Sequence, residues 1–500
     1  MSKFFIKADK NNQIGIIEKT VFGSFVEHLG RSVYNGIYQP SHPTADEKGF
    51  RGDVMQAVSE MGVSIVRYPG GNFVSGYDWK KAIGPVEQRP EVIDLAWIAV
   101  EPNKVGVDEF LHFADKVGAE TVMAVNLGTG NMNDVSDLVQ YCNLQNQGMW
   151  AQKRITNGHK QPYNVRYWCL GNEMDGSWQV CSKSAEDYSK SAVDAAKIIK
   201  WISPEAKTVA CGSNSPFSPT FPAWDKEVLH RTFDYIDYIS MHAYYTYPTS
   251  DHSLQEFLAS GRSFEDYIAR GKKLIIDEKR RRRSDKAVYL SVDEWNVWHT
   301  FDGTSNRQAD WACGLPLLEN NYDMADALVF AEMLLTLVNN ADYVKIGCLA
   351  QLVNVIAPIL TQNDGGVLKQ TTFYPFAYVA GHFAGTAALR TESKLPMYKS
   401  EKYGKAKGVY HTVAYDEATK TYHVAIVNVT DENLAIDITF DQPTNLSAAS
   451  VLSAQDVHAK NTFDNPDNVV LTDVDPHSVW DGKRFVAGSY SVTFAKFTVK

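Results

Sequence analysis

The chain has 500 residues, of which 44% are hydrophobic and 22% charged, with no biased tract long enough to predict disorder. A single core rarely grows to this length, so we expect one large barrel with an appendage, or two to three domains. The formal net charge of −10 argues against general binding to nucleic acids or anionic membranes, because phosphate groups repel acidic surfaces.

The N-terminal segment and the cysteines indicate the compartment. The segment begins with a very short apolar stretch after one lysine and then turns polar, which is too brief for a secretory signal. No window reaches the roughly 18 apolar residues of a membrane span. The six cysteines are far apart without a CxxC pair, which is typical of reduced core residues. We therefore expect a cytoplasmic protein with no membrane partner.

From about Thr20 to Gly385, short apolar or β-branched runs alternate with longer stretches of helical periodicity. This is the pattern of βα units that build a parallel sheet. Eight strands are expected, over residues 21–25, 64–68, 121–126, 165–170, 208–212, 238–242, 288–292 and 345–350. Eight such units favour the α/β class and a closed (β/α)8 TIM barrel over an open, doubly wound sheet.

Some of the expected helices carry their own stop signals. Residues 54–61 end at Gly62 and residues 109–117 end at Gly118, where glycine can adopt the left-handed C-cap conformation. Residues 323–338 have apolar side chains at helical spacing, so we expect this helix to pack on the outside of the barrel.

After Gly385 the apolar periodicity changes to two, as in residues 422–427 and 489–499, with polar turn clusters between the runs. Such alternation is typical of antiparallel strands with one buried face. The pattern predicts an all-β sandwich of jelly-roll type at the C-terminal end.

Two strand-like segments, residues 3–8 and 14–17, precede the first barrel strand. We expect them to pair into the sandwich. The predicted domains are then a catalytic barrel over residues 18–385 and a discontinuous β-sandwich domain of residues 1–17 and 386–500.

In a (β/α)8 barrel the active site lies at the C-terminal face, so a polar residue just beyond a strand is a candidate for binding or catalysis. One such residue alone can be explained as a helix cap or a solvated rim position. Together they predict a polar pocket for a polyhydroxylated ligand. In strand order they are Glu27 and His28, Asn72, Asn126, Asn172 and Glu173, Asn214, His242 and Tyr244, Glu294, and Gln351.

Glu173 and Glu294 each follow a strongly apolar strand, where a carboxylate is costly unless it has a function. Retaining glycosidases use one carboxylate as nucleophile and a second, about 5 to 5.5 Å away, as proton donor. We expect the charge of Glu294 to raise the pKa of Glu173. The alternative is a structural ion pair with Arg67 or Arg166, but Arg67 on the second strand is better placed to hold a catalytic carboxylate.

The segments around these residues resemble the α-L-arabinofuranosidases of glycoside hydrolase family 51, over essentially the whole chain. The motifs are residues 22–31 (FGSFVEHLGR), 67–73 (RYPGGNF), 167–176 (YWCLGNEMDG) and 293–296 (DEWN). Each motif alone is moderately specific, since Asn-Glu after the fourth strand occurs in a large clan of barrel glycosidases. The four together are specific.

The resemblance implies that Glu294 is the nucleophile and Glu173 the acid/base, and that the enzyme assembles as a homohexamer. It also implies a set of substrate-binding residues in and around the innermost subsite. They are Glu27, Asn72, Asn172, Tyr244 and Gln351, with Trp298 or Trp178 against the sugar or the leaving group, and with Arg67 and His242.

Two positions depart from the family pattern. Ile98, after Trp97, stands where arginine is common, and Lys104-Val105 replaces a more usual Glu-Phe. Both lie in the loop after the second strand and outside the expected catalytic set. They bear on the preference for the leaving group.

The leading hypothesis is a retaining exo-hydrolase that removes terminal α-L-arabinofuranosyl residues from saccharides. One alternative is another retaining barrel glycosidase, such as a β-xylosidase or endoglucanase, which would use the same carboxylates. Another is a non-catalytic saccharide-binding protein, which would have no need of two opposed glutamates.

Neither a metal nor a cofactor is expected. His28, His242 and His299 are scattered, without the spacing of a ligand set. The pairs Gly70-Gly71 and Gly365-Gly366 lack both the dinucleotide fingerprint and the phosphate loop.

Overall fold

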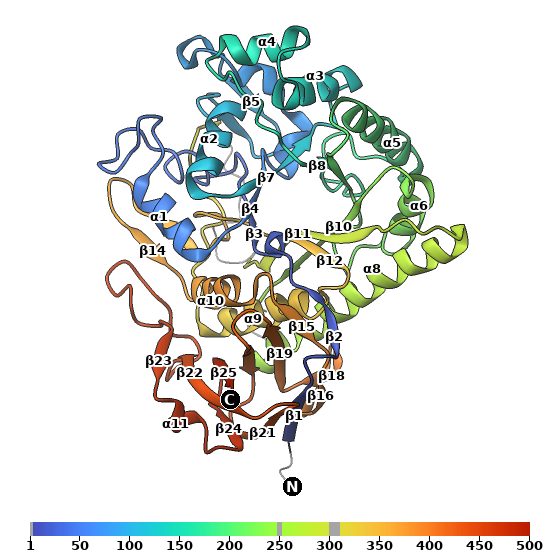
Figure 1. Ribbon diagram of the computed structural model, residues 1–500. Coiled ribbons are helices and arrows are strands. Elements are labelled where there is room, and N and C mark those ends of the chain that lie inside the picture. Colours follow the sequence, from blue (N-terminus) through green and yellow to red (C-terminus); the bar gives the residue numbers. More distant parts are fainter. Residues whose placement is uncertain (1–3, 248–252, 300–310) are drawn as a thin grey trace.

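A computed structural model describes residues 4–247, 253–299 and 311–500. Eight parallel strands close into a barrel in the order β10-β11-β12-β3-β4-β7-β8-β9 (Figure 1). The strands are β3 (Gly23–Phe25), β4 (Ile65–Tyr68), β7 (Glu120–Val125), β8 (Tyr167–Leu170), β9 (Lys207–Ala210), β10 (Tyr238–Tyr245), β11 (Tyr289–Val297) and β12 (Val344–Leu349). The predicted barrel and all eight of its strands are confirmed.

Helices surround the barrel, as βα units require. They are α1 (Gly52–Met61), α2 (Val107–Val117), α3 (Met132–Asn143), α4 (Gly148–Thr156), α5 (Ala185–Ile202), α6 (Ala223–Thr232), α7 (Leu254–Leu258), α8 (Ser260–Arg282), α9 (Met324–Val338) and α10 (Phe373–Phe383). Gly62 and Gly118 end α1 and α2 with φ angles of 77° and 74°, as predicted. No helix in the described ranges is long and apolar enough to cross a membrane.

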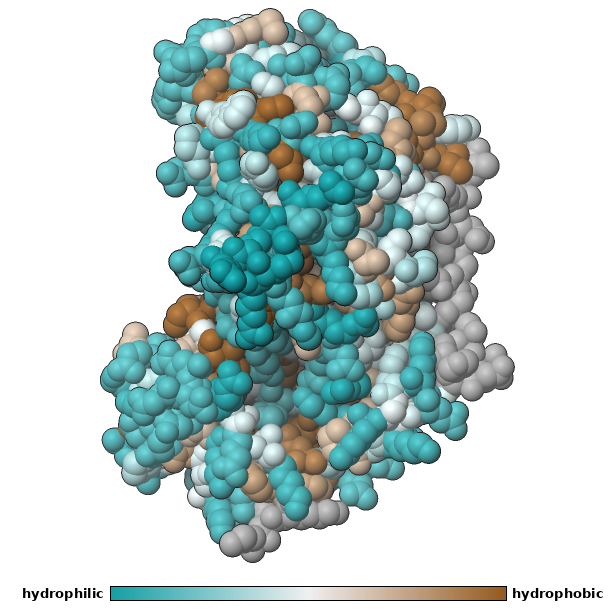
Figure 2. Space-filling model, turned by 90° about the vertical axis from the view of Figure 1, so that its right-hand side faces the viewer, coloured by the Kyte–Doolittle hydropathy of each residue, from teal (hydrophilic) through white to brown (hydrophobic). Residues whose placement is uncertain are grey.

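The face that carries α5, α6 and α8 is mostly hydrophilic, with small and separate apolar patches (Figure 2). Two short hairpins extend from the barrel, β5 (Val92–Asp94) with β6 (Ala99–Glu101), and β13 (Ile359–Thr361) with β14 (Val367–Lys369). The first hairpin is inserted between β4 and α2, so it lies on the side of the barrel where the strands end.

The C-terminal part is a β-sandwich. One sheet has the order β2-β15-β19-β20-β25-β22-β23 and the other β16-β1-β21-β24. Side chains from both sheets, including Ile6, Val424, Ile436, Phe485 and Phe497, share one hydrophobic core. The strands are β15 (Ala387–Leu389), β16 (Glu392–Lys394), β19 (Val409–Asp416), β20 (Thr421–Asn428), β21 (Leu434–Phe440), β22 (Thr444–Leu452), β23 (Thr472–Val474), β24 (Arg484–Ala487) and β25 (Ser491–Val499). A further hairpin, β17 (Met397–Ser400) with β18 (Gly404–Lys407), and the short helix α11 (Pro476–Val479) complete this part.

The first two strands of the chain pair with this C-terminal part. β1 (Phe4–Ala8) lies parallel to β21 and antiparallel to β16, and β2 (Gln13–Ile16) pairs with β15. Lys3, where we expected the first strand to begin, lies outside the described residues. The division into residues 18–385 and residues 1–17 with 386–500 remains our proposal.

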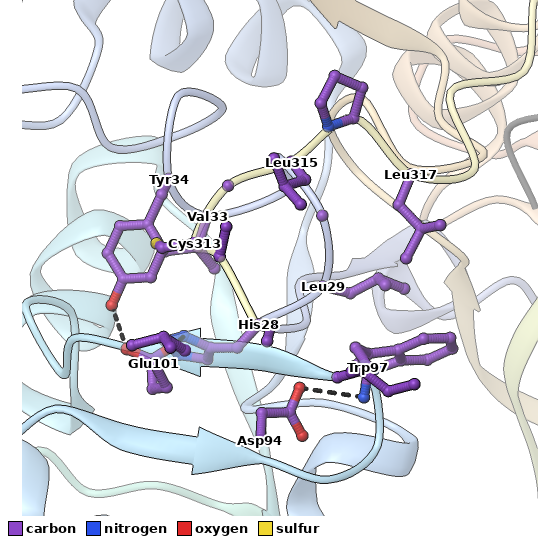
Figure 3. A pocket seen from close by; sticks show the side chains of 17 residues that line it. His28, Leu29, Val33, Tyr34, Asp94, Trp97, Glu101, Cys313, Leu315 and Leu317 are labelled. Carbon is purple, nitrogen blue, oxygen red and sulfur yellow. Dashed lines mark hydrogen bonds and ion pairs between the residues drawn. The ribbon is translucent and has the colours of Figure 1, made fainter. Parts of the chain in front are cut away.

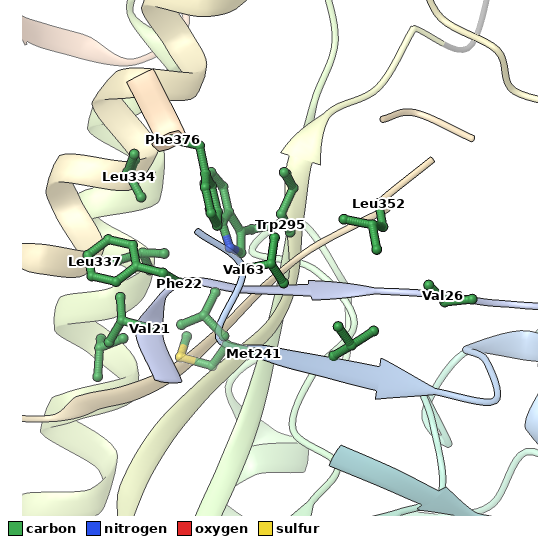
Figure 4. Packing of buried hydrophobic residues seen from close by; sticks show 14 of the residues in the cluster. Val21, Phe22, Val26, Val63, Met241, Trp295, Leu334, Leu337, Leu352 and Phe376 are labelled. Atoms are coloured by element: carbon green, nitrogen blue, oxygen red, sulfur yellow. The ribbon is translucent and has the colours of Figure 1, made fainter. Parts of the chain in front are cut away.

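Helix α9 lies between the barrel and the seven-stranded sheet (Figure 1). All 15 of its residues are buried, because β11 and β12 contact it on one side and β19, β20 and β25 on the other. In Figure 4, Leu334 and Leu337 of α9 pack near Phe22, Phe376 and Trp295. The expected position outside the barrel is therefore correct, but the sheet covers the helix's second face.

Glu332 is a fully buried carboxylic acid within this apolar helix. No side chain in the described part of the chain donates a hydrogen bond to either of its oxygens. Burial, with the nearby charge of Glu265, raises the pKa of Glu332 well above its ordinary value. The group is therefore neutral at a pH where an exposed glutamate is ionised.

We expect Glu332→Gln to reduce the loss of stability at alkaline pH. Since the folded pKa is raised, the stability contributed by the proton is complete below the unfolded pKa and is lost as pH rises through the folded value. Glutamine cannot ionise, so calorimetry at pH 8 should give a melting temperature roughly 2–4 °C above the wild type, with no gain at pH 5.

The control is Glu278→Gln at the end of α8. Hydrogen bonds from Arg281 and Arg282 lower the pKa of Glu278 to about 2, so this carboxylate is ionised at both pH values. The melting temperature of the control variant should therefore lie below that of the wild type by the same amount at pH 5 and at pH 8. A Glu332→Gln variant that behaved in the same way would contradict the prediction.

Candidate active site

Three of the polar residues predicted at the strand ends make other contacts. His28 hydrogen-bonds with Glu101 and Tyr68, Asn126 donates to the Tyr77 carbonyl and to Thr129, and Asn214 donates to Asp175. The others meet at the C-terminal mouth of the barrel. Most of these side chains are less than a tenth exposed, and only Asn72 and Tyr244 are partly exposed. They are Glu27 after β3, Arg67 on β4, Asn72 at the start of a 3-10 helix, Asn172 and Glu173 after β8, His242 and Tyr244 on β10, Glu294 on β11, and Gln351 after β12.

Glu294 is held at both oxygens. Arg67 Nη1 donates a hydrogen bond of 2.6 Å to Oε1, and the Tyr244 hydroxyl donates one of 2.7 Å to Oε2. Burial and the charge of Glu294 raise the pKa of Tyr244 well above its usual range, so the phenol remains a donor. Arg67 also donates to Asn172 Oδ1 at 2.7 Å. Arg67 therefore links Glu294 to Asn172, and its expected role of holding a catalytic carboxylate stays a proposal.

Glu173 lies across the mouth from Glu294, in a backbone conformation with a φ angle of 41°. Trp178 Nε1 donates to its Oε2 at 2.9 Å. One carboxylate oxygen of each glutamate lies within 4.8 Å of the other. So short a separation is compatible with the carboxyl groups about 5–5.5 Å apart that enzymes with a covalent intermediate use.

The pKa of Glu173 is raised above its ordinary value. Burial is the largest cause and the charge of Glu294 adds to it, whereas hydrogen bonds with His242 and Trp178 act in the opposite direction. The prediction that Glu294 raises this pKa was thus right in direction but omitted the larger contribution. A proton on Glu173 beside an ionised Glu294 is the arrangement that a general acid needs.

His242 lies between the two glutamates. Its Nδ1 is 2.9 Å from Glu173 Oε1 and 3.5 Å from Glu294 Oε2, and its Nε2 is 3.3 Å from Asp293 Oδ1. Burial alone would lower the pKa of His242, but attraction to Glu294, Asp293 and Glu173 outweighs it and raises the pKa to about 10. His242 is therefore an imidazolium at neutral pH.

Glu173, His242 and Glu294 could together present three ligand atoms to a metal ion. A histidine must lose its proton to bind a metal, and the three surrounding carboxylates hold the proton on His242. The expectation that no metal is used stays a prediction.

Glu27 accepts three hydrogen bonds, from the backbone N–H of Phe73 at 2.9 Å, from Trp97 Nε1 at 3.0 Å and from Gln351 Nε2 at 3.3 Å. Burial raises the pKa of Glu27 to about 7. Gly71 lies among the site carboxylates, and a Cβ on it would be 3.1 Å from Glu294 Oε1 and 3.4 Å from Glu27 Oε2. Because glycine has no side chain, the backbone at Gly71 can lie this close to the site carboxylates.

The rim of the site is apolar. Trp298 meets the Tyr244 ring edge-on with centroids 5.3 Å apart, and both pack against a cluster that includes Leu29 and Leu317. Figure 3 shows Leu29, Leu317 and Trp97 around a neighbouring pocket. Trp178, at 50% exposure, forms another part of the rim beside Glu173. Such surfaces suit the apolar face of a sugar or leaving group.

Two protein-family models match the chain, the α-L-arabinofuranosidase 1 domain over residues 57–262 and the α-L-arabinofuranosidase C-terminal domain over residues 293–491. The chain is 41% identical over 480 residues to the intracellular exo-α-(1→5)-L-arabinofuranosidase 1 of Bacillus subtilis, covering 96% of this chain and 94% of that protein. It is 45% identical over 420 residues to the intracellular exo-α-(1→5)-L-arabinofuranosidase of Halalkalibacterium halodurans, covering 84% and 83%.

Among solved structures, a family 51 α-L-arabinofuranosidase from Bifidobacterium longum is similar with a TM-score of 0.94 and 37% identity. The match covers 99% of this chain and all of the other. The chain belongs to glycoside hydrolase family 51. It is therefore a glycosidase of the α-L-arabinofuranosidase family, and the resemblance inferred from the four motifs is confirmed.

Two members of this family 51 site were missed or misjudged from the sequence. Trp97, which we named from the sequence only as the neighbour of Ile98, donates a hydrogen bond to Glu27 from the turn between β5 and β6. It was missed because this hairpin is an insertion rather than a strand end. Asp293 was quoted only within a motif, yet it contacts both Arg67 and His242.

Proposed function

We propose that this enzyme removes terminal non-reducing α-L-arabinofuranosyl residues from arabinose-containing oligosaccharides or polysaccharides by double displacement, with net retention. The observation that carries this proposal is the pair of buried glutamates, whose nearest oxygens lie within 4.8 Å, in a family 51 barrel. The exo action and the α-(1→5) linkage are supported by the names of the two relatives.

In the first half-reaction the carboxylate of Glu294 attacks the anomeric carbon and the bond to the leaving oxygen breaks. Glu173 gives its proton to that oxygen. In the second, water attacks the anomeric carbon, Glu173 takes up a proton from it, and the ester bond to Glu294 breaks. Hydrogen bonds from Arg67 and Tyr244 aim the Glu294 carboxylate at the substrate.

The substrate hydroxyls are assigned to the polar groups around Gly71. Asn172 Nδ2 and Gln351 Oε1 are buried and have no hydrogen-bond partner among the described residues, so a donor and an acceptor are free for the sugar. With Glu27, Asn72 and Tyr244 they form the proposed innermost subsite. Trp298 and Trp178 are proposed to contact the sugar or the leaving group.

We further propose a cytoplasmic location and a hexameric assembly. The word intracellular in the names of both relatives supports the first. The second rests on the resemblance to the family alone, and light scattering of the purified enzyme tests it.

The substrate class is tested by release of the chromophore from an aryl α-L-arabinofuranoside beside the matching β-D-xylopyranoside. We expect turnover of the arabinofuranoside and release of arabinose from α-(1→5)-linked arabinobiose. Cleavage of the xyloside alone would favour a β-xylosidase, and activity on neither would favour a saccharide-binding protein.

Gly71→Ala should reduce kcat/KM by roughly 10–100-fold, because the added methyl narrows the subsite and displaces Glu294 by a few tenths of an ångström. The melting temperature should change little, since the φ angle of Gly71 is −86° and requires no left-handed conformation. Gly76→Ala, where a Cβ meets nothing within 4 Å, is the matched control and should keep wild-type kinetics. If both variants had the same kinetic constants, Gly71 would not be part of the subsite.

A further inference from the structure

Asp293 is a carboxylate that the double displacement leaves unused. It is buried to 1% exposure on β11, directly before Glu294. Successive side chains of a regular strand point to opposite faces, but the pairing of β11 with β12 shifts register between Val292 and Trp295. This irregularity lets both carboxylates turn toward the inside of the barrel.

Each contact of Asp293 is with a residue beneath the site. Its Oδ1 is 3.3 Å from His242 Nε2, and its Oδ2 is 3.8 Å from Arg67 Nε and 3.4 Å from Cys169 Sγ. Arg67 and His242 are the cations that touch the two glutamates. Asp293 therefore reaches the reacting groups only through these cations.

The charges in contact with Arg67 and His242 balance in the resting enzyme. Arg67 and His242 supply two positive charges, and Glu294 and Asp293 supply two negative charges while Glu173 holds its proton. After the sugar is bonded to Glu294, that carboxylate has lost its charge and Glu173 has gained one. The sum is unchanged, and the negative charge has moved from one side of His242 to the other.

We propose that Asp293 is a positioning residue that holds His242 facing both glutamates and balances its charge, so that one imidazolium stabilises whichever carboxylate is ionised. This inference rests on the proposed roles of Glu173 and Glu294. The distances allow it, because Nδ1 lies 2.9 Å from Glu173 and 3.5 Å from Glu294 without any movement of the ring. Asp293 lies 3.3 Å from the opposite nitrogen, at ion-pair distance, and supplies the countercharge.

The charged and titratable groups around His242 come from several elements. They are Glu173 after β8, Asp293 and Glu294 on β11, Arg67 on β4 and Tyr244 on β10, with Cys169 of β8 against Asp293 and Glu27 on the far side of Gly71. Among these groups only Asp293 faces both cations without facing the substrate. Glu294 is the strongest attraction on the His242 proton and stays in place, so removal of Asp293 should leave the site with one excess positive charge.

The test is Asp293→Asn, a substitution of the same shape, followed by the pH dependence of kcat/KM on an unactivated arabinoside. The alkaline limb of this profile reports loss of the Glu173 proton in the free enzyme. An excess positive charge favours the ionised form of Glu173, so the limb should move to lower pH by about one unit or more. Cys169→Ala, which removes the uncharged contact of Asp293, and Glu332→Gln, which removes a buried carboxylate from α9, should leave the limb unchanged.

His242→Gln provides the opposite sign and a second route if Asp293→Asn does not fold. Loss of the imidazolium removes a positive charge from Glu173, so the alkaline limb should move to higher pH. A folded Asp293→Asn enzyme with the wild-type limb, or a His242→Gln limb that does not rise, overturns the inference. Glu294→Ala in the same assays separates this inference from the proposed function. If Glu294→Ala is inactive, only the role of Asp293 is overturned. An active Glu294→Ala enzyme would refute the proposed function itself.

Discussion

Glu294→Ala should lower kcat for an aryl α-L-arabinofuranoside on the order of 10⁴-fold or more, as removal of a nucleophile does in other covalent hydrolases. The reason is geometric. Arg67 and Tyr244 hold Glu294 by hydrogen bonds, and no other carboxylate among the described residues occupies that position. Chromophore release under saturating substrate measures the effect. The melting temperature should fall, because the substitution leaves the buried cations Arg67 and His242 without one of their partners.

Sodium azide is the diagnostic addition for this variant. Azide can enter the space left by the carboxylate, attack the anomeric carbon and displace the aryl oxygen. The product should be the β-L-arabinofuranosyl azide, of inverted configuration, because the single displacement takes place on the nucleophile's face. Wild-type turnover in Glu294→Ala, or an azide product of retained configuration, would show that another residue is the nucleophile.

Glu173→Ala should slow hydrolysis by an amount that depends on the leaving group of the substrate. Hydrolysis of α-(1→5)-linked arabinobiose should fall roughly 10²–10⁴-fold, because its leaving alkoxide needs a proton. An aryl arabinoside with an acidic phenol should still form the intermediate at Glu294, so the first turnover should remain fast and a burst of phenol should precede a slow steady state. Stopped-flow absorbance measures both phases.

The pH profile provides the second readout for Glu173. Its raised pKa gives the wild-type kcat/KM an alkaline limb, and this limb should be absent from Glu173→Ala. Azide should here attack the arabinosyl-enzyme and give the α-azide, of retained configuration. An unchanged alkaline limb would assign the proton to another group, for which Glu27 is the candidate, since its pKa is raised to about 7.

The strands and the two glutamates could be predicted because each has a local signal. An apolar run of four to six residues marks a buried parallel strand, and a carboxylate directly after it has no structural reason to be there. Glu173 and Glu294 satisfy this rule, as does Glu27 after β3, and the amide of Gln351 follows β12 in the same way. The parallel order of a (β/α)8 barrel then brings their side chains to one mouth.

The parts that could not be predicted depend on contacts between distant segments. His242 has the same sequence signal as any strand-end histidine, and its charge follows only from three carboxylates on two other elements. Trp97 reaches Glu27 from an inserted hairpin, whose fold does not follow the βα repeat. Asp293 turns inward only because β11 has an irregular register, and single-sequence periodicity does not report such an irregularity.

The position of helix α9 affects how the protein unfolds. One side of the helix packs against the barrel strands and the other side packs against the seven-stranded sheet of the sandwich. The side chains of α9 therefore belong to the hydrophobic packing of both parts. A fragment ending near residue 385 would expose one whole face of an apolar helix to water and should aggregate. For the same reason the intact chain should melt in a single cooperative transition rather than in two.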